Sequence, residues 1–289
     1  MEFASLDDLC AKGRSLLAHG PVALIFVEDP VEIGSTVRHH AGAAFHEIIV
    51  FHPAGIAPPE DTAPLAHWVA YDSHAAGAVP AAVNALIAAA PATTWFYYGY
   101  NSEYLYFPFS EHRNIRELLA FHAEERRDAM LAYVIDLYAP DLDRFPNAVS
   151  LDEAMFDRSG YCALGRHDPD TGQPKERQLD IFGGLRWRFE EHVPWARRKI
   201  DRIALFRARK GLELRDDHTF NIEEYNTCAC PWHHNLTAAV MSFRTAKALK
   251  TNPGSTFDIT SFLWQNSITF EWQSQQLLDL GIIEPGQWF

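Results

Sequence analysis

The chain lacks the features that mark disulfide-rich, membrane-spanning and nucleic-acid-binding proteins. It has only 4 cysteines in 289 residues, at irregular spacings, so reduced thiols are expected rather than a disulfide framework. No apolar run approaches the roughly 18 residues that a membrane-spanning helix needs, and no signal-peptide pattern opens the sequence. Its 25 basic residues face 38 acidic ones, and the net charge of −13 argues against nucleic acid or an anionic membrane as the main partner. These absences predict a cytoplasmic protein.

Apolar side chains, by contrast, are abundant. Hydrophobic residues make up 47% of the chain and aromatic residues 13%, which is enough to bury a large core. The length permits one large domain or two small ones, and we expect a single domain over residues 1–289. The acidic composition still permits a small phosphate-bearing ligand, because arginines and backbone N–H groups can make one pocket locally positive.

Apolar runs and helical spacings alternate through the first half of the chain. A strand is predicted over 22–27, because six successive apolar residues suit a strand buried on both faces. A helix over 33–44 and a strand over 48–51 complete a β-α-β unit, which requires a parallel sheet. The other predicted elements are strands over 67–71, 94–98, 129–137 and 203–207, and helices over 83–90 and from the Asn114 capping box onward.

The second half of the chain has a different character. Residues 141–194 are dense in Pro, Gly, Asp and Arg, which predicts a long, partly ordered excursion over the ligand-binding face. The last sixty residues have a helical pattern, and their expected core anchors are Phe262, Leu263, Trp264, Leu277 and Leu278.

The strand over 94–98 leads into the polar segment Gly99-Tyr100-Asn101-Ser102-Glu103-Tyr104-Leu105. Open α/β sheets bind ligands at the carboxyl ends of their strands. The segment resembles a site in family 2-like glycosyltransferases of the A-type fold, which reads hydrophobic-Asp-x-Asp-Glu-Phe-Leu and whose two Asp hold a divalent cation against the donor diphosphate. When Glu103 is aligned on the Glu of that motif, Tyr100 and Ser102 stand in the two Asp positions.

Other blocks of the chain carry the same resemblance. Residues 26–45 and 47–51 are similar to the family's opening, in which an acidic residue ends the first strand, and Asp29 falls on that acidic position. Gly183-Gly184-Leu185-Arg186 is similar to a Gly-Gly-x-Arg stretch of the family, and the His233-His234 segment is similar to its late His.

The resemblance implies a nucleotide-diphospho-sugar transferase-like α/β fold, with a mixed, mostly parallel sheet and helices on both faces. It implies a nucleotide-binding half in residues 1–140 and an acceptor-side half in 141–289. The implied activity is transfer of a sugar from a nucleotide-diphosphate donor to an acceptor that the sequence does not identify. The alternative is a catalytically degenerate protein of this fold that binds or scaffolds, because both Asp ligands are replaced.

The resemblance also assigns roles to individual residues. Asp29 and Asp72 are expected near the nucleoside, Glu103 near the sugar as the candidate catalytic residue, and Arg186, His233 and His234 near the phosphates. The residues themselves leave a structural alternative open for each acid. Asp29 and Asp72 are also typical of helix starts, and Glu103 of a carboxylate that ties down a neighbouring loop.

Metal dependence is expected to be weak or absent, since Tyr and Ser are poor ligands for hard divalent cations. The remaining candidates for a weak Mn²⁺ or Mg²⁺ site are Asn101 and Glu103. Cys228 and Cys230 precede two histidines and invite a zinc interpretation. Structural zinc sites, however, usually separate paired cysteines by two to four residues and need a second ligand pair, so no stoichiometric zinc is predicted.

Three further features have both a structural and a functional interpretation. The pair His39-His40 closes a helix beside the sheet, which favours structural histidines. The pair Gly183-Gly184 would let the backbone approach a ligand closely. Trp187 and Trp195 are able to stack on sugar rings, although each is more often part of a core.

Overall fold

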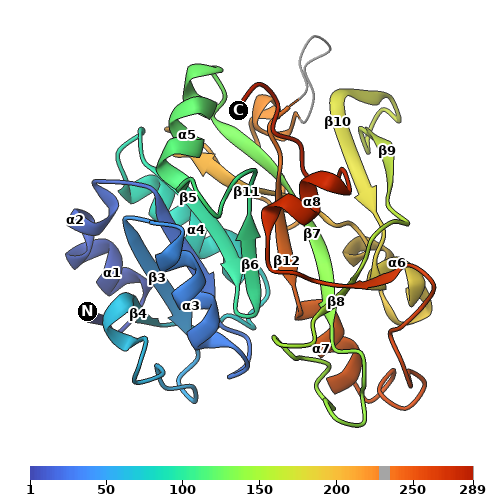
Figure 1. The fold of residues 1–289 in the computed structure, drawn as a ribbon. Coiled ribbons are helices and arrows are strands. Elements are labelled where there is room, and N and C mark those ends of the chain that lie inside the picture. The colour runs from blue at the N-terminus through green and yellow to red at the C-terminus, as the bar shows by residue number, and fades with distance from the viewer. Residues whose placement is uncertain (228–234, 289) are drawn as a thin grey trace. The chain divides into compact units, whose positions relative to one another are not determined.

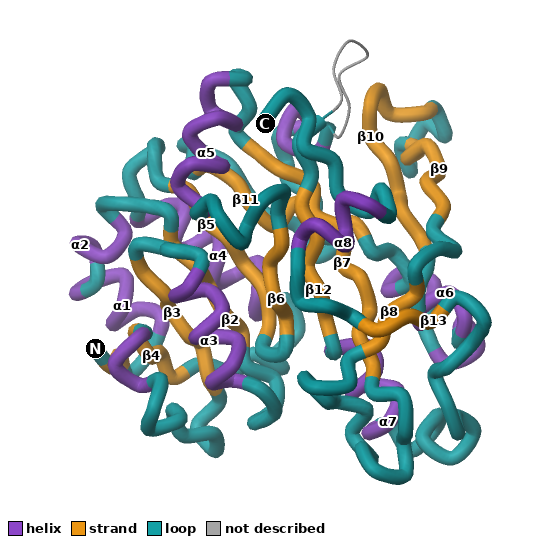
Figure 2. The backbone as a smooth tube through the Cα atoms, in the orientation of Figure 1, coloured by secondary structure: helices purple, strands orange, loops and turns teal. Residues whose placement is uncertain are grey.

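The structure, a computed structural model, describes residues 1–227 and 235–288. The chain forms two compact units whose segments alternate along the sequence (Figures 1 and 2). The first unit comprises Met1–Tyr104, Ser110–Leu131 and Ile203–Asn226. The second unit comprises Leu105–Phe109, Ala132–Arg202 and Thr227–Phe289. The interpretation of the chain as one domain with halves that meet near residue 140 stays a prediction.

Parallel strands form most of the sheet of the first unit (Figure 1). Their spatial order is β1 (Glu2–Phe3), β4 (His67–Ala70), β3 (Glu47–His52), β2 (Val22–Phe26) and β5 (Trp95–Tyr100). β11 (Asp201–Arg207) pairs antiparallel with β5, so the sheet is mixed. The α/β class and the mixed sheet expected from the sequence are thereby confirmed.

Helices cover this sheet on two faces. They are α1 (Leu6–Lys12), α2 (Arg14–Leu17), α3 (Ile33–Gly42), α4 (Ala78–Ala89) and α5 (Ile115–Glu124), with the short 3-10 helices η1 (Ala63–Leu65) and η4 (Glu223–Asn226). From β2 the chain moves outward through β3 to β4, and it then returns past β2 to β5. Because βαβ crossovers are right-handed, this reversal places α3 and α4 on opposite faces of the sheet.

Local sequence signals account for these elements. All five residues of β2 are buried, as the uninterrupted apolar run predicts. Asn114 caps α5 by accepting from the backbone N–H groups of Arg116 and Glu117, and the Glu117 carboxylate accepts in return from the Asn114 N–H. Aromatic pairs fill the core between strands, with the rings of Phe26 and Phe51 stacked at 4.8 Å.

The second unit has its own strands. β7 (Ala129–Tyr138) enters this unit at Ala132, pairs in parallel with β12 (Ala238–Ser242), and pairs antiparallel with β8 (Met155–Asp157). β8 also pairs with β13 (Ser267–Thr269), and β9 (Cys162–His167) with β10 (Pro174–Phe182) forms a separate two-stranded sheet. β6 (Glu103–Tyr106) runs across the boundary between the units. The helices are α6 (Leu185–Arg188), α7 (Arg244–Thr251) and α8 (Ser274–Asp279), with 3-10 turns η2 (Glu190–His192) and η3 (Trp195–Arg197).

The prediction of a helical C-terminal segment is wrong in large part. Figure 2 shows strands in this segment beside the short helices α7 and α8. Residues 238–242 are all buried, and the apolar run 238–241 is too short for a core helix, so the segment pairs with β7 instead. Phe262 is a core residue as expected, whereas Leu263 is 45% exposed. Residues 141–194, expected to be an excursion, contain strands β8, β9 and β10.

No helix in residues 1–227 and 235–288 is long and apolar enough to cross a membrane.

Candidate functional site

The candidate site lies in the first unit, at the carboxyl ends of β2 and β5. The strand order changes direction here, because β3 and β4 lie on one side of β2 and the later strand β5 on the other. The chain leaves neighbouring strands toward opposite faces at such a switch point, and open α/β sheets bind ligands there. The loop after β2 carries Asp29, and β5 is followed at once by Asn101.

Asn101 joins the two strand ends. Its side chain is fully buried, and its Oδ1 accepts from the Glu28 backbone N–H at 2.9 Å. Its Nδ2 lies 2.9 Å from Asp29 Oδ1, 3.0 Å from the Asp29 carbonyl oxygen and 2.8 Å from the Val31 carbonyl oxygen. The carboxamide therefore fixes the loop 28–31 to the end of β5. These contacts engage both polar atoms of the Asn101 side chain with the protein itself.

Asp29 is half-buried and oriented by this network. Its Oδ1 accepts from the Val31 backbone N–H at 2.9 Å in addition to its contact with Asn101. It does not cap the following helix, because the N-cap of α3 is Glu32 in a left-handed conformation, with φ of 57°. The structure thus does not support the helix-cap alternative for Asp29. It places the carboxylate at the switch point, on the loop that follows β2.

Side-chain and backbone hydrogen bonds hold the turn between β5 and β6. Ser102 has a φ of 62°, its N–H donates to Thr36 Oγ1 at 2.8 Å, and its hydroxyl donates to the Val31 carbonyl at 2.9 Å. Glu103 is fully buried, and its Oε2 accepts from the Tyr100 backbone N–H at 3.0 Å. This is the contact of a carboxylate that holds a loop. A catalytic role for Glu103 stays a prediction.

A buried histidine packs between α3 and β5. His40, on α3, is fully buried, with its Nδ1 at 2.8 Å from the Thr36 carbonyl oxygen and its ring 4.9 Å from that of Tyr97. Burial lowers the pKa of His40 to about 3, and the neighbouring His39 adds to the effect. This histidine is therefore neutral at physiological pH, in agreement with the structural interpretation.

The other predicted residue of the first unit lies elsewhere on the sheet. Asp72 follows β4, which is separated from β2 by β3. It is exposed, and its Oδ1 accepts from the His74 backbone N–H at 3.0 Å. The structure does not bring Asp72 to the switch point beside Asp29.

Arg186 belongs to the second unit, where it is held by protein groups. Its Nε donates to Thr245 Oγ1 at 3.1 Å, its Nη1 donates to the Lys199 carbonyl at 2.5 Å, and Asp136 lies 3.8 Å away. The preceding glycines do not leave room for a ligand. A Cβ on Gly183 would lie 2.3 Å from the Tyr161 ring, and one on Gly184 would lie 2.7 Å from Asp136 Oδ2.

Trp187 and Trp195 are 44% and 61% exposed, so their interpretation as core residues is wrong. Trp195 stacks against Phe182 with ring centroids 5.4 Å apart. Their proposed stacking on sugar rings stays a prediction.

Some predicted residues lie outside the part of the chain that the structure describes. They are His233 and His234, together with Cys228 and Cys230 of the zinc interpretation. In the described residues, no group of three or more His, Cys, Asp or Glu side chains is placed to hold a metal ion. The weak cation site at Asn101 and Glu103 gains no support, since protein groups already engage both side chains.

The comparisons add no family. The sequence matches no protein-family model, and no curated protein is similar enough to count as a relative.

The second unit contains buried charges that were not predicted from the sequence. Asp157 is 1% exposed and accepts from the Tyr138 hydroxyl, from Arg188 Nη1 and from Trp264 Nε1. Asp136, also 1% exposed, accepts from the Leu185 N–H at 2.9 Å, and burial raises its pKa. The available signal was an acid within the otherwise apolar run 129–138.

Proposed function

We propose that this protein binds a nucleotide-diphosphate sugar in its first unit and transfers the sugar to an acceptor, as a glycosyltransferase-like enzyme. The observation that carries the proposal is the switch point between β2 and β5. A half-buried carboxylate, Asp29, stands there on a loop fixed by Asn101. An acid at the end of an early strand suits hydrogen bonding to ribose or base hydroxyl and amino groups.

In the proposed chemistry, protein side chains position the donor nucleotide, and no preformed cation site takes part. Asp29 orients the nucleoside through hydrogen bonds from its ribose or base. Glu103 is assigned to the sugar by the resemblance alone. Arg186, His233 and His234 keep their phosphate role as a prediction of the same kind.

A binding or scaffold protein that has lost catalysis is the second candidate. The observation that favours it is that Tyr100 and Ser102 stand in the positions of the motif's two Asp, while Asn101 and Glu103 beside them are engaged by protein groups. A thermal-shift panel of nucleotide sugars, followed by an assay for donor consumption, distinguishes an active glycosyltransferase from a binding or scaffold protein. Binding to the folded state raises the melting temperature by mass action, whereas only an enzyme also consumes the donor.

Nucleotide diphosphate binding is expected to depend little on divalent cation, because Tyr100 and Ser102 replace carboxylate ligands. Calorimetric titrations of UDP and GDP in EDTA and then in excess manganese should give similar dissociation constants. An affinity gain of more than about tenfold, or roughly 1.4 kcal/mol, would contradict cation-independent binding.

A further inference from the structure

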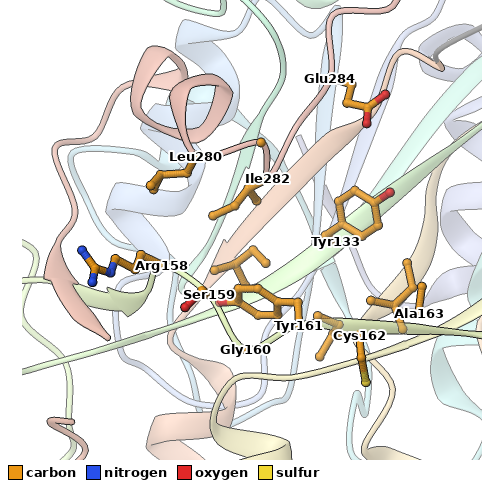
Figure 3. A pocket seen from close by; sticks show the side chains of 14 residues that line it. Tyr133, Arg158, Ser159, Gly160, Tyr161, Cys162, Ala163, Leu280, Ile282 and Glu284 are labelled. Carbon is orange, nitrogen blue, oxygen red and sulfur yellow. The ribbon is translucent and has the colours of Figure 1, made fainter. Parts of the chain in front are cut away.

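A pocket of about 330 Å³ opens in the second unit, and its lining includes none of Asp29, Asp72, Glu103 and Arg186 (Figure 3). Residues of β7, the segment between β8 and β9, the hairpin β9–β10 and the turn after α8 line it. Small-molecule sites generally measure about 300–1,000 Å³ and combine an apolar lining with a few polar groups. The size therefore suits a ligand of one ring or one short chain.

The lining of the pocket combines polar groups with a set of apolar side chains. Its lining includes Ile135, Ile181, Ile200, Leu280 and Ile282, which come from four separate segments of the chain. The four isoleucines are buried: Ile135 and Ile181 lie on β7 and β10, Ile200 just before β11, and Ile282 on the turn after α8. Such a surface favours an apolar or aromatic body, because water displaced from it returns to bulk solvent.

One edge of the pocket carries a positive charge. Arg158 and Ser159 are exposed and follow β8 directly. The Arg158 guanidinium makes no hydrogen bond or ion pair with any residue in the described part of the chain, whereas Arg166 and Arg188 of the same unit are paired with carboxylates. A guanidinium beside a hydroxyl matches the oxygens of a carboxylate or phosphate group.

The two charged residues of the lining, Arg158 and Glu284, determine how an anionic ligand would be oriented in the pocket. Figure 3 shows Arg158 and Glu284 on different sides of the pocket, with the Tyr161 ring and apolar side chains between them. An anionic group pairs with Arg158, and a second anionic end would meet the carboxylate of Glu284. The fitting ligand thus has one anionic end and an uncharged body.

We propose that this pocket binds a small ligand that carries a single anionic group, carboxylate or phosphate, on an aromatic or apolar body. Arg158 and Ser159 receive the anionic group, and the isoleucine-rich interior receives the body. The proposal does not depend on the nucleotide site.

Cys162 offers a direct report of occupancy. It lines the pocket, and its thiol is free and exposed. A variant that keeps Cys162 and carries serine at the other three cysteines confines alkylation by a maleimide to this position. A ligand in the pocket should slow that alkylation.

The probes are benzoate, phenyl phosphate and the neutral benzamide, measured by protection of Cys162 and by ligand-detected NMR. Either anion should bind at roughly millimolar concentration and protect Cys162, and benzamide should bind at least about tenfold more weakly. Preference between benzoate and phenyl phosphate identifies the anionic group.

Arg158→Gln should weaken binding of the anion by about tenfold or more and leave benzamide unchanged. Arg197→Gln removes the same charge from an exposed position outside the pocket and should change nothing. Ala163→Phe, at an exposed position of β9, should block the pocket while keeping every charge. The proposal is overturned if neither anion protects Cys162, if benzamide binds as well as the anions, or if Arg158→Gln binds them as wild type does.

Discussion

Replacement of Asp157 by alanine is expected to lower the free energy of unfolding by about 3–5 kcal/mol, the range for breaking a buried ion pair on one side. Arg188 donates to both carboxylate oxygens of Asp157, at 3.0 and 3.1 Å, and its side chain is only 15% exposed. The substitution leaves that guanidinium without its counter-charge. It also removes the acceptor of the Tyr138 hydroxyl at 2.5 Å and of Trp264 Nε1 at 2.7 Å.

Urea unfolding of matched variants measures this effect. Asp143→Ala, which removes an exposed carboxylate from the same unit, should change stability by no more than about 0.5 kcal/mol. The double variant Asp157→Ala/Arg188→Met should recover part of the loss, because it removes both charges from the interior. A loss below about 1 kcal/mol in Asp157→Ala would show that the buried pair does not hold this unit together.

Acidification is expected to destabilise the first unit through its buried histidines. Burial lowers the pKa of His40 to about 3 and that of His122 to about 4, below the ordinary value of 6.5. Below pH 6.5 the unfolded chain therefore binds more protons than the folded chain, so stability falls as the pH falls. Each histidine should account for about 2 kcal/mol between pH 6.5 and 5, at 1.36 kcal/mol for each pKa unit.

The variant His40→Phe isolates the contribution of one site. Its ring packs where His40 now lies against Tyr97 and Phe45, and it does not titrate. The difference in unfolding free energy between wild type and this variant should shift by about 2 kcal/mol in favour of the variant from pH 7.5 to pH 5. His74→Phe, at an exposed position, should leave the pH dependence as it is in wild type. A pH dependence that His40→Phe leaves unchanged would mean that His40 protonates freely in the folded protein.

The parallel part of the first unit could be predicted from the sequence because its signals are local. The run 22–27, the helical spacing over 33–44 and the Asn114 capping box each specify a structure within a few residues. The C-terminal strand β12 was not predicted, because it has no such local signal. Its five buried residues carry no period, and only pairing with β7, more than 100 residues away, makes them a strand.

The candidate site was predictable in position but not in its contacts. Asp29 and Asn101 were placed at the ends of strands, and the adjacency of β2 and β5 brings them together. The Asn101 carboxamide fixes the loop 28–31 only because this pairing brings together residues more than 70 positions apart. No local sequence pattern predicts that contact. The space beside Gly183 and Gly184 is filled by side chains from distant segments, which the glycines alone do not reveal.

The central claim is that a nucleoside diphosphate binds at the switch point through Asp29. Calorimetric titration of UDP and GDP into wild type, Asp29→Asn and Glu60→Gln tests it most directly, with Glu60→Gln as an exposed carboxylate control on the same unit. At least one diphosphate should bind wild type and Glu60→Gln equally, and Asp29→Asn should bind it about tenfold more weakly, the loss of a charge-assisted hydrogen bond, with its unfolding transition unchanged. Failure of wild type to bind either diphosphate or any nucleotide sugar, or an affinity in Asp29→Asn equal to that of wild type, would contradict the claim.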